Sequence, residues 1–141
     1  MSYVMKPIGV YAIDIMNRPG MLARILEALS NAGADLEFVI ARRVTQNTTR
    51  VFVAPLKGAK VLRAAKDVGL QIAEGMHALR IEGPDRPGLG AMMTRGLASA
   101  GLSIRGLSAA SIKKRSVCYI ALATEAEMVT AQKVLKKVLK K

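Results

Sequence analysis

The spacing of apolar residues changes along this chain, and each spacing predicts a different element. Ile8 to Ile15 is an apolar, β-branched run with partial alternation, which predicts a strand. From Met21 to Ala32 the apolar residues recur three or four positions apart, which predicts an amphipathic helix ending at Gly33. The pattern then predicts two strands, a second helix and a short strand, at residues 36–44, 50–54, 61–68 and 70–73.

The same order of elements begins again in the second half of the chain. The pattern predicts a strand, a helix and two strands at residues 78–82, 89–100, 102–112 and 117–123. A last helix opens at Thr124, which forms a capping box with Glu127. No residues then remain for a fourth strand. We expect the open edge beside 78–82 to be covered by a second copy of the chain or by the bridging segment 70–82.

Two of the predicted helices start with nearly the same sequence. NRPGMLARILEALSNAG begins at Asn17 and DRPGLGAMMTRGLASAG begins at Asp85, and seven of the seventeen aligned positions are identical. A fixed offset of 68 residues indicates a duplicated structural unit. The order strand, helix, strand, strand, helix, strand forms an antiparallel sheet with both helices on one face. We therefore predict an α+β protein of two ferredoxin-like βαββαβ units, 1–75 and 76–141, the second without its last strand.

The composition excludes several classes of protein. The chain has 141 residues, 51% of them hydrophobic, which suits a globular protein with one ordinary core or two small ones. The single cysteine, Cys118, and the single histidine, His77, leave no cluster of metal ligands, and we expect Cys118 to lie in the core. No nucleotide-binding loop and no nucleophile–base or paired-carboxylate arrangement is present, so we expect neither a cofactor nor an enzyme.

The N-terminus has no basic start followed by a long apolar core, and no apolar run is long enough to span a bilayer. These features predict a cytoplasmic protein with no membrane partner.

The net charge of +12 keeps a second function open. Five lysines lie between Lys133 and Lys141, and Lys113, Lys114 and Arg115 form a smaller cluster. Such a balance favours association with polyanions, and RNA-binding modules share the βαββαβ order. These modules stack bases on sheet aromatics, for which only Phe52 and Tyr119 qualify here. A basic nucleic-acid-binding module, or a protein-interaction adaptor that docks through the basic C-terminal helix, is therefore the alternative.

The two repeated turns have a chemistry of their own. The first N–H groups of a helix are unpaired and carry partial positive charge, so they attract a carboxylate. Gly20 and Gly88 let a ligand approach the backbone, while Asn17 and Asp85 place a polar side chain at the mouth of the turn. Together these groups suit an α-amino acid. The structural alternative is that Asn17 and Asp85 only cap the helices, with Pro19 at the first helical position.

Asn17-Arg18-Pro19-Gly20 after a strand, followed by a helix and by Ala32-Gly33-Ala34-Asp35-Leu36, resembles the ACT domain, a βαββαβ regulatory module that binds amino acids. Two such units without a catalytic domain are similar to the free-standing tandem ACT proteins, of which the glycine-cleavage-type transcriptional regulators are one branch. The resemblance implies a regulatory homodimer that senses an amino acid where ACT units meet, with a regulatory protein partner left open.

The resemblance also implies a set of ligand-binding residues. In serine-sensing relatives, the Asn of the turn and an Asn at the start of the second strand contact the ligand across a domain interface. Asn17 matches the first position, whereas the second is Asp35 in one unit and Ser103 in the other. The expected ligand-binding residues are Asn17, Arg18, Gly20, Met21, Asp35, Asp85, Arg86, Gly88, Leu89 and Ser103. Which amino acid binds is not fixed by these residues.

Overall fold

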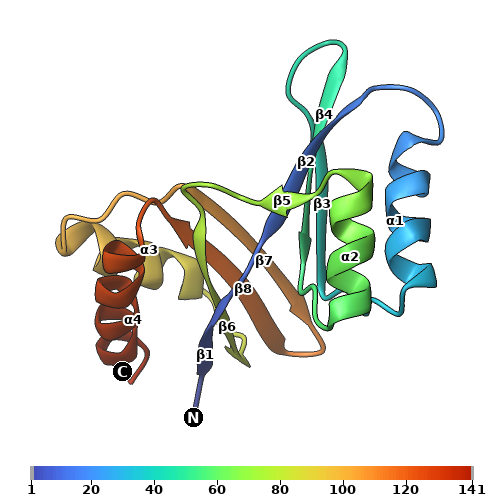
Figure 1. Cartoon of the computed structure of the whole chain (residues 1–141). Helices are drawn as coiled ribbons and strands as arrows, with labels where there is room; N and C mark the ends of the chain where they lie inside the picture. Colours follow the sequence, from blue (N-terminus) through green and yellow to red (C-terminus); the bar gives the residue numbers. More distant parts are fainter. Residues whose placement is uncertain (1, 141) are drawn as a thin grey trace. The chain divides into compact units, whose positions relative to one another are not determined.

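The structure, a computed structural model, describes residues 2–140. These residues form two four-stranded antiparallel sheets, each with two helices on one face (Figure 1). The predicted fold class, two ferredoxin-like ACT-type units, is confirmed. The elements in chain order are β1 (Val4–Ile8), β2 (Tyr11–Met16), α1 (Met21–Asn31), β3 (Phe38–Arg43), β4 (Thr48–Ala54), α2 (Ala59–Val68), β5 (Gln71–Ile72), β6 (His77–Pro84), α3 (Leu89–Ser99), β7 (Gly106–Ile112), β8 (Arg115–Leu122) and α4 (Glu125–Leu139).

The first unit spans Gly9–Ala73 and is continuous in sequence. Its strands lie in the order β3-β4-β2-β5, so the first and third strands of the unit pair at the centre of the sheet. The strands direct alternate apolar residues toward α1 and α2, where Ile25, Leu29, Val51 and Val53 form the centre of the core. Leu29 is fully buried because it lies on the apolar stripe of α1.

The second unit takes its fourth strand from the start of the chain. Its strands lie in the order β1-β6-β8-β7, and β1 runs antiparallel to β6 with Val4 opposite Glu82 and Ile8 opposite Ala78. The strand β1 thus occupies the position that β5 occupies in the first sheet. The compact unit consists of β1 together with everything from Glu74 onwards. Residues 2–8, placed in the first unit by the boundary 1–75, therefore lie with the second.

Side chains as well as backbone hold β1 in this sheet. Tyr3 and Met5 pack against the core of the second unit. The Tyr3 hydroxyl donates a hydrogen bond of 2.7 Å to the carbonyl of Pro84, and its ring lies over Gly83, where a Cβ would collide with it. Pro7 is compatible with this arrangement because β1 is an edge strand, whose outer N–H groups need no partner.

The prediction of what pairs with the open edge of β6 was wrong. Neither a second copy nor the segment 70–82 pairs with this edge; the N-terminal strand does. The predicted strand from Ile8 to Ile15 corresponds to β2, except that its first residue, Ile8, ends β1 in the other sheet. Pro7 and Gly9 interrupt the local pattern, so the short apolar segment before them gave no separate strand signal.

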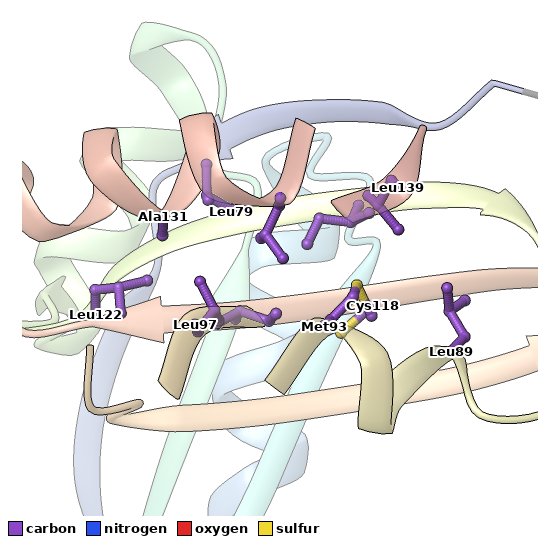
Figure 2. Close-up of a cluster of buried hydrophobic side chains, with 11 residues drawn as sticks. Leu79, Leu89, Met93, Leu97, Cys118, Leu122, Ala131 and Leu139 are labelled. Atoms are coloured by element: carbon purple, nitrogen blue, oxygen red, sulfur yellow. The ribbon is translucent and has the colours of Figure 1, made fainter. Parts of the chain in front are cut away.

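The core of the second unit lies between its sheet and the helices α3 and α4. Leu89, Met93 and Leu97 project from α3 toward the strand β8, which carries Cys118 and Leu122 (Figure 2). The C-terminal helix α4 contributes Ala131, Leu135 and Leu139, four residues apart, so its apolar face is used in the core as expected. The predicted cap of α4 is confirmed, because the Thr124 hydroxyl accepts a hydrogen bond of 3.1 Å from the N–H of Glu127.

Alanine substitution at the two glycines within α3 should change the stability of the protein in opposite directions. A Cβ on Gly96 would lie 2.7 Å from Cγ2 of Val138 on α4, whereas a Cβ on Gly90 would have nothing within 4 Å. Alanine favours a helix by about 1 kcal/mol over glycine, while overpacking costs about 1–3 kcal/mol. We expect Gly90→Ala to raise and Gly96→Ala to lower the free energy of unfolding, measured by urea denaturation. A gain in both variants would contradict the close approach of α3 and α4.

Candidate functional site

The repeated turns join β2 to α1 and β6 to α3. In each turn the glycine is left-handed, with φ of 87° at Gly20 and 81° at Gly88, and the helix starts at the next residue. The N–H of that residue donates a 3.3 Å hydrogen bond to the carbonyl of the turn arginine, Arg18 or Arg86. Pro19 therefore precedes the helix, and its predicted place as first helical residue is wrong.

Asn17 and Asp85 do not cap the helices, since neither helix has a side-chain capping hydrogen bond. Each residue instead attaches its turn to the adjacent β-hairpin. The N–H of Asn17 donates to the carbonyl of Asn47 at 2.7 Å, and the N–H of Asp85 donates to the carbonyl of Lys114 at 2.9 Å. The capping interpretation is therefore wrong for both positions, and it does not account for their side chains.

The side chains of Asn17 and Asp85 contact equivalent residues on the edge strands of their sheets, β3 and β7 respectively. Asp85 Oδ2 accepts a hydrogen bond of 2.7 Å from the hydroxyl of Ser111 on β7. With its amide oxygen turned toward β3, Asn17 accepts hydrogen bonds from Arg43 Nη2 at 2.6 Å and Nε at 3.2 Å. Arg43 and Ser111 are related by the same 68-residue offset as the turns. The repeats thus share a geometry but differ in charge: an acid beside a serine, against an amide beside a cation.

A pocket of about 300 Å³ lies beside the turn of the second unit. It is bounded by the turn, the first residues of α3 and the strands β7 and β8. Four of the predicted ligand-binding residues line it: Asp85, Arg86, Gly88 and Leu89. The other lining residues are Gly90, Met93, Leu107, Ala109, Ala110, Ser111, Ser116 and Cys118.

Two residues of β8 form part of the pocket wall. Ser116 is only 7% exposed, and it lines the pocket. Cys118 is buried beside it, and burial raises the pKa of its thiol to about 11. The thiol is therefore neutral and unreactive near neutral pH. The prediction that Cys118 lies in the core is confirmed.

The remaining predicted residues lie elsewhere. Asp35 and Ser103 are exposed and precede β3 and β7, after the C-terminal ends of the helices. Strands of this length extend about 20 Å, and the turns lie at their other ends. Within a unit, the structure therefore does not bring Asp35 to Asn17 or Ser103 to Asp85. Arg18, Gly20 and Met21 stay at the turn of the first unit, where Arg18 is exposed.

Ser111 and Ser116 also belong to the site, although no sequence pattern predicted them. Ser111 is separated from Asp85 by 26 positions and reaches it only because β7 pairs with β8 and β8 with β6. The repeat offset relates Ser111 to Arg43, but without the strand register it places neither residue beside its turn.

Other kinds of site receive little support. Within residues 2–140, no group of three or more His, Cys, Asp and Glu residues is placed to hold a metal ion. The described helices include none that is long and apolar enough to cross a membrane. Phe52 and Tyr119 do occupy equivalent positions, opposite Ala12 and Arg80, on the sheet faces away from the helices. Phe52, however, is only 9% exposed, so its ring is not available to stack on a base.

Comparison with known proteins supports the fold. No sequence-family model and no curated protein matches the chain. A crystal structure of a protein from Bacteroides thetaiotaomicron is 18% identical, matching 94% of this chain and 89% of that chain with a TM-score of 0.80. The ligand-free regulatory subunit of aspartate kinase from Thermus thermophilus is also 18% identical, matching 98% and 95% with a TM-score of 0.68. At such identities the agreement concerns the fold, which is the tandem ACT-type fold that the repeated turns predicted.

Proposed function

We propose that this chain is a non-enzymatic regulatory module that binds a free α-amino acid in the pocket of its second unit. The observation that carries the proposal is the combination, in one pocket, of an acid, an arginine and the start of a helix. A zwitterionic ligand needs both charges matched at a separation of a few ångströms. The fold it shares with a regulatory subunit of aspartate kinase supports a regulatory rather than a catalytic role.

The carboxylate of the ligand binds at the start of α3. The N–H groups of Gly88, Gly90 and Ala91 have no partner among the described residues, because the preceding chain turns away before it can supply carbonyls. The helix dipole adds positive potential at this point, and the half-buried Arg86 lies at the pocket rim. The N–H of Leu89, one of the expected ligand-binding residues, already donates to the carbonyl of Arg86.

The ammonium group of the ligand has its counterpart in Asp85. The hydrogen bond from Ser111 engages Oδ2 and fixes the orientation of the carboxylate, which leaves Oδ1 to accept from the ligand. The equivalent place in the first unit holds Asn17 and Arg43, where a cation would repel an ammonium group. We therefore assign the amino-acid site to the turn at Asp85 and not to the turn at Asn17.

Placing an arginine in the second unit, at the position equivalent to Arg43 of the first, should abolish amino-acid binding. In Ser111→Arg, the guanidinium would pair with Asp85 and fill the pocket, so we expect affinity to fall at least about a hundredfold, or ~2.7 kcal/mol. Binding is measured by isothermal titration calorimetry against the twenty amino acids. A ligand at 100 times its Kd should also raise the melting temperature by several degrees, since it adds about 2.7 kcal/mol of stability.

The matched control is Arg43→Ser, which makes the same exchange in reverse in the first unit. It should leave the affinity unchanged, because the proposed ligand does not contact that turn. If Ser111→Arg bound as well as the unmodified chain, or if Arg43→Ser removed binding, the assignment to the second unit would be wrong.

A further inference from the structure

We infer that the pocket selects an amino acid with an aliphatic side chain, and that Ser116 recognises the backbone portion of that ligand. The inference rests on the proposed function and narrows its ligand class. It follows from the order in which polar and apolar side chains line the pocket from one end to the other.

The strand register divides the pocket into rows. Ser111 lies opposite Ser116, and Asp85 contacts Ser111, so the end of the pocket next to the turn is polar. One row further along, Ala109 lies opposite Cys118. The apolar part of the lining also includes Leu89, Met93 and Leu107. A ligand held by its charged groups at the turn would therefore direct its side chain along an apolar wall.

The apolar rows offer nothing to a polar or charged side chain. The Cys118 thiol is neutral and a weak hydrogen-bond donor, and the neighbouring Met93 and Ala109 have no strong polar atoms. A hydroxyl, amide or charge placed there would lose water without a replacement partner. An aliphatic side chain would instead cover Leu107, which is 47% exposed at the rim. A volume of about 300 Å³, at the small end for ligand pockets, has room for a single amino acid.

Ser116 supplies a further polar group at the polar end of the pocket. Ser116 is only 7% exposed, and it lines the pocket together with Ser111 and Asp85. A serine hydroxyl that lines a pocket is able both to donate a hydrogen bond to a ligand and to accept one from it. Because Ser116 shares a row with Ser111 and Asp85, its oxygen is placed to accept a second hydrogen bond from the ligand ammonium group.

The test is a calorimetric titration of the full chain with leucine, valine and methionine against serine, aspartate and lysine. We expect each of the first three to bind at least tenfold tighter than any of the second three. Ala109→Asp places a charge in the apolar wall at an exposed position, so it should weaken leucine binding at least tenfold. Ala41→Asp, at the equivalent edge-strand position of the first unit, is the matched control and should leave leucine binding unchanged.

A second variant separates backbone recognition from side-chain selection. Ser116→Ala should weaken all the amino acids that bind by a similar factor, about tenfold, without changing their ranking. The ranking in the unmodified chain remains decisive even if this variant folds poorly.

The outcomes distinguish the two proposals. If none of the twenty amino acids binds, the proposed function itself fails. If serine, aspartate or lysine binds as tightly as leucine, the aliphatic preference is refuted while amino-acid binding stands. Unchanged leucine affinity in Ala109→Asp would equally overturn the assigned direction of the side chain, and unchanged affinities in Ser116→Ala would overturn the role of Ser116.

Discussion

Removal of residues 2–8 is expected to unfold the second unit while the first stays folded. The deletion removes β1, and with it the packing of Tyr3 and Met5 and the ladder that joins β1 to β6. The lost burial and hydrogen bonds amount to about 3 kcal/mol or more, which is a large part of the stability of a small domain. Exposure of the β6 edge should also promote aggregation. Hydrogen exchange followed by mass spectrometry would localise the loss of protection.

Point variants of β1 provide a control for this deletion. Met5 packs on the core, whereas Lys6 is exposed on the other face of the strand. Met5→Asp should therefore reproduce the loss of protection in β6 and β8, and Lys6→Gln should have little effect. If the truncated chain kept full protection in β6, the N-terminal strand would not be an integral part of this sheet.

Two leucines at equivalent positions of the repeat each support their own unit, so replacing one of them by alanine should destabilise that unit alone. Leu29 on α1 and Leu97 on α3 are related by the repeat offset, and each is fully buried in its own core. Truncation of a fully buried leucine costs about 2–5 kcal/mol, from lost transfer free energy and from the cavity left behind. Leu97→Ala should release protection in β1 and β6–β8, whereas Leu29→Ala should release it in β2–β5. Hydrogen exchange on both variants provides the measurement.

The decisive feature of this pair is the behaviour of β1. The amides of β1 should lose their protection from exchange in Leu97→Ala, although they precede the first unit in sequence. If they instead followed Leu29→Ala, the division of the chain into Gly9–Ala73 and the remainder would be incorrect.

Local patterns were sufficient to predict most of the fold. The helix stripes around Leu29 and Leu97 and the capping box at Thr124 depend on residues a few positions apart, so the sequence displays them directly. The pairing of β1 depends on Val4 meeting Glu82, a contact between residues 78 positions apart. No periodicity encodes that contact. The missing last strand was predicted, but not the segment that replaces it.

The site could be predicted only in part, because strand pairing brings some of its residues together from distant parts of the sequence. Asp85, Arg86 and Gly88 form one short motif, and the structure places all three at the pocket. Ser111 and Ser116 join them only through sheet register, which a single sequence does not reveal. Residue type also suggested the wrong role for Asn17, a favoured capping residue that instead anchors its turn to the hairpin at Asn47.

The origin of β1 affects the order in which the chain folds during translation. This strand leaves the ribosome before the first unit, Gly9–Ala73, whereas β6 follows only after that whole unit has been made. The first unit has all its own strands at that stage, while β1 remains without a partner. Contacts between residues so far apart in sequence close late and slow folding. A strand that is synthesised before the first unit thus reaches its native position only after that unit is complete.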